Sequence, residues 1–244
     1  MIRIYRSPDP PGSLKKEIKK KNGSYRKQDV HDKLKEDFHN KCYICETKPM
    51  LSRDIDHLKP HLNANFGSEN WEIKFAWDNL FLSCHHCNML KSDKEDILNC
   101  CERDPEQALC QKVDRHVVSV TPLDPNDQSA AVTAQLIQEA FMAQKPPARK
   151  LDAADRRELL HEELMHLLET LDQYKKCRRK SKKKTELFET LRQMIQLDQA
   201  YAGFLRTEIR EIQESWIKCP ELKELLVTGQ EQNDEHTSET EVLV

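Results

Sequence analysis

The stretch from Cys42 to Asp93 decides the fold of this chain, because two Cys-x-x-C pairs bracket a polar insert. It reads C-Y-I-C at 42–45, I-D-H-L-K-P at 55–60, W-D-N-L at 77–80 and C-H-H-C-N-M-L-K-S-D at 84–93. Two residues between thiolates let one turn present both sulfurs to one tetrahedral ion. The stretch therefore predicts a structural zinc site whose four ligands are Cys42, Cys45, Cys84 and Cys87.

The insert between the two pairs contains residues suited to metal-assisted hydrolysis. A nuclease needs a base that takes a proton from water and a hard cation that neutralises charge on the phosphate. A histidine such as His57 ordinarily has a pKa that suits a base near neutral pH, and an Asp56 carboxylate or an asparagine carbonyl suits Mg²⁺. Asn79 is expected to hold the loop and orient His57, and Lys91 to contact a phosphate. Each residue alone also has an ordinary interpretation, such as a turn former, a helix cap or a surface pair.

Composition predicts an α+β fold with many helices. Only 5 glycines and 6% aromatic residues argue against a large sheet, and the second half is rich in leucine at helical spacing. The net charge of −3 gives no bulk positive field, so any nucleic-acid site depends on local clusters. The first residues contain no apolar signal sequence and no stretch is long enough to span a membrane, so we expect a cytoplasmic protein with reduced cysteines.

Four regions are expected along the chain: an extended basic N-terminal arm over 1–28, the zinc-knuckle domain over 29–125, a helical region over 126–228 and an acidic disordered tail over 229–244. Hydrophobic spacing predicts helices over 29–41 and 129–145, a long helix capped by Asp152, and a last helix over 187–216. Strands are expected over 80–82 and 117–120. The basic run over 175–184 is either an exposed interhelical turn or a nucleic-acid contact.

The order D-H, N-L and C-x-x-C-N-x-x-K-S-D resembles the HNH endonuclease motif of the ββα-metal superfamily, in its four-cysteine zinc form. The resemblance implies a small zinc-stapled ββα-metal core followed by a mainly helical C-terminal region. It makes His57 the general base and Asn79 the central asparagine, with Asp56 and Asn88 as ligands of a catalytic Mg²⁺ or Mn²⁺. Asn88 departs from the histidine often found at the third position but keeps a metal ligand there.

A narrower resemblance comes from the opening M-I-R-I-Y-R-S-P-D-P-P-G-S-L together with the overall layout. These are similar to the HNH nuclease subunit of Septu-type anti-phage defence systems, including retron-associated ones. This implies a nucleic-acid substrate, DNA being favoured, and an ABC/SMC-like ATPase partner docked by the helical region. Two alternatives stay open: an RNA-cleaving HNH effector, and a non-catalytic zinc-knuckle adaptor that binds nucleic acid or protein.

Overall fold

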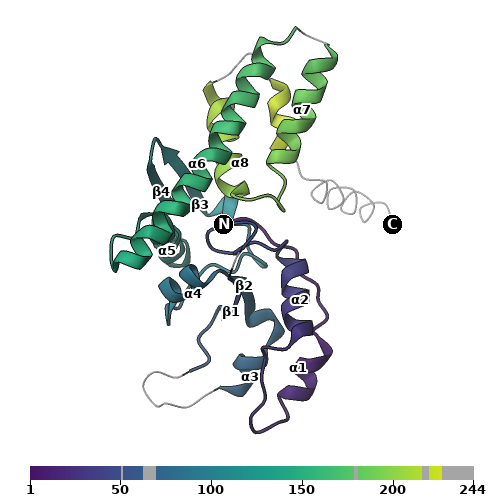
Figure 1. Cartoon of the computed structure of the whole chain (residues 1–244), viewed down its shortest axis with the longest axis vertical. Coiled ribbons are helices and arrows are strands. Elements are labelled where there is room, and N and C mark those ends of the chain that lie inside the picture. Colours follow the sequence, from purple (N-terminus) through teal and green to yellow (C-terminus); the bar gives the residue numbers. More distant parts are fainter. Residues whose placement is uncertain (51, 63–69, 179–180, 216–219, 227–244) are drawn as a thin grey trace.

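The computed structural model of the chain describes residues 1–50, 52–62, 70–178, 181–215 and 220–226 (Figure 1). Helices and two small antiparallel sheets make up the fold, so the predicted α+β class is confirmed. In chain order the elements are α1 (Gly12–Glu17), α2 (Gln28–Asp37), β1 (Asp54–His57), α3 (Trp71–Phe75), η1 (Trp77–Asn79), β2 (Leu80–Ser83), α4 (His85–Lys91), η2 (Pro105–Gln107), β3 (Leu109–Asp114), β4 (Val117–Pro122), α5 (Gln128–Met142), α6 (Pro147–Lys176), α7 (Lys182–Met194), α8 (Ala202–Ser215) and η3 (Pro220–Leu226).

The first sheet and the helix after it position the candidate site. β1 pairs antiparallel with β2, with Asp56 opposite Phe81 and His57 opposite Leu80. All four side chains of β2 are buried, as predicted for an apolar strand over 80–82. Along the chain α3 and η1 separate β1 from β2, and β2 runs through Cys84 directly into α4, so the paired strands lead into one helix that carries Cys87.

The N-terminus differs from the predicted extended arm. Met1, Ile2 and Ile4 are at most 2% exposed, and the Ile4 amide donates a hydrogen bond of 3.0 Å to the carbonyl of Cys100. Figure 1 shows this end in the middle of the molecule, between α1–α3 and α6–α8. The three apolar side chains bury surface that the expected extended conformation would leave in water, so they enter the core. The lysines of α1 and the following turn are exposed, as expected for a basic segment.

Two hydrophobic cores divide the chain at a different place from the predicted boundary near 125. α5 packs against β4, and its Leu136, Ile137 and Phe141 belong to the core that also contains the four paired cysteines. A second core lies among the last helices and consists of Leu164, Leu167, Leu171, Tyr174, Leu191, Ile195, Leu205, Ile209, Ile212, Leu222 and Leu225. The helix predicted over 129–145 therefore packs in the same core as the four paired cysteines.

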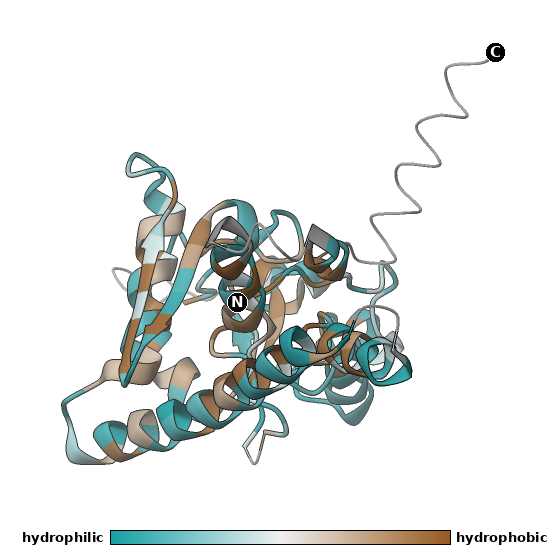
Figure 2. Cartoon of the chain, turned by 90° about the horizontal axis from the view of Figure 1, so that it is seen from above, coloured by the Kyte–Doolittle hydropathy of each residue, from teal (hydrophilic) through white to brown (hydrophobic). Residues whose placement is uncertain are grey.

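The C-terminal helices begin and end differently from the prediction. α6 starts at Pro147, which suits a first turn because proline lacks the amide that a helix start leaves unpaired, so Asp152 lies inside the helix and does not cap it. The helix predicted over 187–216 is two helices, α7 and α8, separated near Tyr201, whose φ is 53°. In Figure 2 the long helix α6 carries a mixture of hydrophilic and hydrophobic residues along its length, and its buried residues include Leu160, Leu164 and Leu167.

Two predicted segments lie partly or wholly outside the described residues, and the prediction about membrane-spanning stretches can be compared only with the described part of the chain. The basic run over 175–184 joins α6 to α7, with residues 179–180 not described. The acidic tail over 229–244 lies outside the described residues altogether. Within the described part of the chain, no helix combines the length and apolar character needed to cross a membrane.

Candidate metal centre and adjoining pocket

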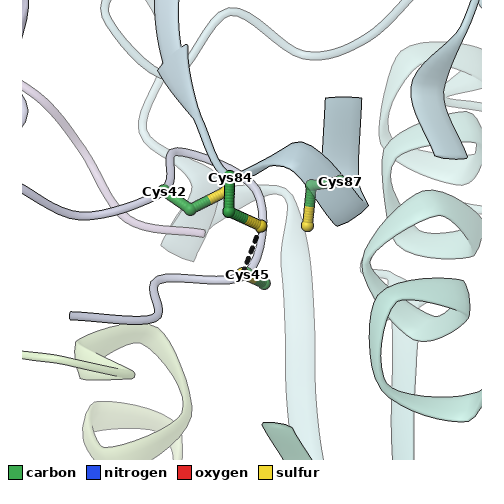
Figure 3. Close-up of side chains that lie close together, drawn as sticks. All are labelled: Cys42, Cys45, Cys84 and Cys87. Atoms are coloured by element: carbon green, nitrogen blue, oxygen red, sulfur yellow. Dashed lines mark hydrogen bonds between the residues drawn. The ribbon is translucent and has the colours of Figure 1, made fainter. Parts of the chain in front are cut away.

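The four paired cysteines meet at one point. Their Sγ atoms all lie within 4.8 Å of one another, every one of the four is buried, and none forms a disulfide (Figure 3). The sulfurs of Cys45 and Cys84 are 3.8 Å apart. A tetrahedral zinc with Zn–S bonds of about 2.3 Å requires sulfur–sulfur distances of about 3.8 Å. The predicted ligands therefore form a cluster that could hold a structural zinc ion.

Local backbone geometry brings the two pairs together. The first pair lies in a turn closed by a hydrogen bond of 2.9 Å from the Glu46 amide to the Cys42 carbonyl, and the Tyr43 amide ties this turn to β2 by donating to Leu82 at 3.0 Å. Cys84 immediately precedes α4, and Cys87 follows within its first turn. A strand end, a turn and a helix start thus supply all four sulfurs.

Arg156, from α6, lies against this cluster although no sequence motif points to it. Its Nη2 donates to Sγ of Cys84 at 3.3 Å. Burial alone would lower the pKa of the Arg156 guanidinium, but the thiolates of Cys45 and Cys84 raise it overall. Four thiolates around one Zn²⁺ leave two net negative charges, so a cation beside a sulfur is stabilising. The long helix therefore contributes to the environment of the metal centre.

Lys41 and Glu46, which flank the first cysteine pair (Cys42 and Cys45, the first knuckle), form hydrogen bonds with the N-terminal end of α8 and the residues before it. The buried Lys41 ammonium donates to Oε2 of Glu46 at 3.2 Å and to the carbonyl of Gln199 at 3.0 Å, while the Gly203 amide donates to Oε1 of Glu46 at 3.2 Å. Burial alone would raise the pKa of Glu46, but the N-terminal ammonium and Lys41 lower it. A Cβ at Gly203 would lie 2.7 Å from Oε1 of Glu46 and 2.7 Å from the backbone oxygen of Met1, so only glycine permits this approach.

A pocket of about 490 Å³ opens beside β1 and α4. Three of the predicted site residues, Asp56, His57 and Asn88, line it. Its other lining residues are Tyr25, Arg26, Ile55, Pro60, His61, Leu62, Ser92 and Asp93. The sequence predicts no site role for Tyr25, gives His61 only as a histidine near the motif, and offers Arg26 only as part of a basic segment that could contact phosphates; the fold brings all three to the pocket.

His57 is held as a neutral imidazole with a defined tautomer. Its Nε2 lies 3.0 Å from the carbonyl oxygen of Lys74, which can only accept a hydrogen bond, so Nε2 carries the proton and Nδ1 is the free acceptor. Burial lowers the pKa of His57 to about 4. Its ring packs edge-on against Tyr25 at 4.6 Å and lies 4.1 Å from the ring of His61. Near neutral pH the imidazole is therefore uncharged, with Nδ1 unprotonated, and the lowered pKa makes it a weaker base than an exposed histidine.

Asn79 lies behind the pocket and fixes the loop after β1. Its Oδ1 accepts from the amide of Lys59 at 2.7 Å, and its Nδ2 donates to the carbonyls of Lys59 at 2.9 Å and Ile73 at 3.1 Å. Its own carbonyl accepts from the Leu58 amide at 2.9 Å. Asn79 therefore fixes the segment next to His57 without bonding to the imidazole.

Lys91 is buried, which differs from the predicted phosphate contact. It is 1% exposed, and its Nζ donates to the His57 carbonyl at 2.7 Å and lies 3.4 Å from Oδ1 of Asp56. The other Asp56 oxygen accepts from the Tyr43 hydroxyl at 2.6 Å. Burial raises the pKa of Asp56, and the Lys91 charge opposes that rise. Lys91 thus compensates a buried carboxylate and holds the end of β1.

Asn88 extends from α4 toward β1, where it meets Asp54 instead of the expected Asp56. Its Nδ2 donates to Oδ2 of Asp54 at 3.0 Å, and the same oxygen lies 2.9 Å from Nδ1 of His85. No bond to Oδ1 of Asn88 occurs among the described residues. An asparagine carbonyl and a carboxylate are donors of the kind that Mg²⁺ prefers, but both oxygens of Asp56 already have partners, Tyr43 and Lys91. Asp54 was missed, although its spacing of two from Asp56 places it on the same face of β1.

Comparisons with known proteins identify no relative of this chain. No family model matches it, and neither a curated protein nor a solved structure is similar to it at a significant level. The chemistry of the site therefore has to be inferred from its own residues.

Proposed function

We propose that the chain is a metal-dependent HNH endonuclease that hydrolyses phosphodiester bonds of nucleic acid, with DNA the favoured substrate. The observation that carries the proposal is the pocket that His57, Asp56 and Asn88 all line. The antiparallel pair β1–β2 followed by α4, next to four clustered cysteines, supports it, because a ββα-metal core has two antiparallel strands and then a helix; here α3 and η1 lie between the two strands along the chain.

Each side chain receives one task under this proposal. Nδ1 of His57 accepts the proton of the attacking water, since Nε2 is engaged by Lys74. Asp56 and Asn88 hold Mg²⁺ or Mn²⁺, which when bound neutralises charge on the phosphate and on the leaving oxygen. Asn79 keeps the loop that carries Lys59 in place. The four cysteines hold zinc in a structural role, because a closed tetrathiolate site leaves no position for water.

The biological setting of the proposal comes from the resemblance to Septu-type defence nucleases. We propose that the chain is the effector of an anti-phage complex and that its helical region over 126–228 docks an ABC/SMC-like ATPase. RNA is the alternative substrate, because no described residue of the pocket is recognisable as a reader of the sugar.

The test compares cleavage by the wild type, His57→Ala and the matched control His166→Ala, which removes an exposed histidine of α6. Plasmid DNA and total RNA are offered in parallel with Mg²⁺ or Mn²⁺, with and without the co-encoded ATPase. Loss of a general base typically costs about 10²- to 10⁴-fold in rate. We expect that loss in His57→Ala alone, with zinc content unchanged in all three proteins. Equal cleavage by all three would refute the role of His57.

One observation favours a second function, a non-catalytic zinc-knuckle adaptor. Asp56 already has partners on both oxygens, Tyr43 and Lys91, as a purely structural carboxylate would. An adaptor would bind nucleic acid or protein, cleave neither DNA nor RNA under any of these conditions, and bind equally well after His57→Ala.

A further inference from the structure

The segment between α1 and α2 forms one wall of the pocket, although it precedes the motif by more than a dozen residues. The Tyr25 ring lies edge-on to His57 at 4.6 Å and contacts the ring of Phe75 at 6.5 Å. The Ser24 amide donates to Oε2 of Glu17 at 3.0 Å, which fixes the turn that follows α1. Tyr25 thus packs against the rings of His57 and Phe75, and its own ring lies next to the guanidinium of Arg26.

Arg26 carries the unpaired positive charge of this wall. It is exposed, and its guanidinium lies 5.4 Å from the centre of the Tyr25 ring. Among the described residues that line the pocket it is the only lysine or arginine, and among the described residues it forms no ion pair. Its neighbour Lys27, in contrast, lies 3.7 Å from Glu17, and Lys91 is buried against Asp56.

We propose that Arg26 contacts a backbone phosphate of the nucleic-acid substrate and positions the strand at His57, with Tyr25 as its support. A guanidinium matches two phosphate oxygens at once, and an aromatic ring beneath it reduces the freedom lost on binding. Further lysines of α1 and its following turn are exposed, although Lys20 pairs with Glu17, and Figure 1 places α1 at the same end of the molecule as α3. These lysines are Lys15, Lys16, Lys19, Lys20 and Lys21. The inference rests on the proposed nuclease function and names the surface that receives its substrate.

Arg26 would thus make the phosphate contact that the sequence predicted for Lys91, which is buried. The chain as a whole has a net charge of −3, so nucleic acid is attracted only where positive charges gather and acidic partners are few. A residue that touches a phosphate strengthens binding to any sequence and increases the dependence of binding on salt.

The test measures binding of a fluorescently labelled DNA duplex by anisotropy, with Ca²⁺ in place of Mg²⁺ to prevent cleavage, between 50 and 200 mM KCl. The variants are Arg26→Ala, Arg26→Lys and the matched control Arg192→Ala, which removes an exposed arginine lying 5.3 Å from the ring of Phe188 on α7. Loss of one phosphate contact makes the negative slope of log K against log salt shallower by about 0.9, and it weakens binding about eightfold at 0.1 M salt. We expect this change in Arg26→Ala, retention of the slope in Arg26→Lys, and wild-type binding in Arg192→Ala.

Cleavage measured with Mg²⁺ separates this inference from the function on which it rests. If the wild type binds and cleaves and Arg26→Ala has the same slope, affinity and KM, Arg26 is not a phosphate contact and the nuclease proposal stands. If neither the wild type nor Arg192→Ala binds or cleaves DNA or RNA, with or without the ATPase, both proposals fail. A rise in KM of Arg26→Ala at unchanged kcat supports a contact that binds the strand without altering the base.

Discussion

Removal of the Arg156 guanidinium should weaken zinc binding even though Arg156 is not a ligand. Its Nη2 lies 3.3 Å from Sγ of Cys84 and supplies a positive charge next to thiolates that carry excess negative charge around zinc. Groups bonded to metal ligands in this way typically change metal affinity by 10- to 100-fold, or about 1.4 to 2.7 kcal/mol. We expect Arg156→Met, which keeps most of the side-chain length, to lose affinity within that range, and Arg156→Lys to lose less.

The assay is competition for zinc against a chromophoric chelator of known affinity at fixed pH. Lys150→Met serves as the matched control, because it removes an exposed positive charge from the same helix without a sulfur contact. Circular dichroism of the zinc-loaded proteins checks that α6 is intact in each variant. An Arg156→Met protein that holds zinc within twofold of the wild type would refute the reasoning, because the guanidinium would then contribute nothing to the metal site.

Two further changes test other parts of the structure. Gly203→Ala should lower the free energy of unfolding by about 1 to 3 kcal/mol, or the melting temperature by roughly 3 to 9 °C, because a Cβ would lie 2.7 Å from Oε1 of Glu46. An unchanged melting temperature would mean that α8 does not pack this closely against Glu46. Glu17 has its pKa lowered to about 2 by its bonds to Lys20 and to the Ser24 amide, so the stability it adds is complete above pH 4.5 and is lost as the pH falls through 2. The melting temperatures of the wild type and Glu17→Gln should therefore differ near neutral pH and converge toward pH 2, and a difference that is independent of pH would contradict this.

The zinc cluster and β2 were predictable because their signals are local. Two Cys-x-x-C pairs specify a tetrahedral site by spacing alone, and Leu80 to Leu82 form an apolar run too short for a helix. β3 was not found, because Gln111 interrupts the alternation of its side chains at a buried position. That glutamine is satisfied by a hydrogen bond of 2.9 Å from its Nε2 to the Met1 carbonyl, a partner that lies far away in the sequence.

The candidate site was predictable in its residue types but not in its geometry. Neighbouring residues such as Asp56 and His57 point to opposite faces of a strand, and the fold decides which neighbour each one meets. Asp56 meets Lys91, and Asn88 meets Asp54. Helix ends were also predicted poorly, because a leucine repeat continues past the interruption between α7 and α8. Contacts such as those of Asp56 with Lys91 and of Asn88 with Asp54 join residues that are far apart in the sequence, so no local sequence pattern indicates them.

The contact between the first knuckle and α8 has a consequence for synthesis of the protein. Gly203 follows Cys87 by 116 residues, so all four cysteines have been translated well before the helix that packs against Glu46. At about 5 to 20 residues per second, roughly 6 to 23 s separate these events. A zinc ion held by the four cysteines would therefore have time to bind the nascent chain before the later helices fold against the first cysteine pair. Zinc shortage during translation would leave Lys41 and Glu46 without a fixed geometry when α8 arrives.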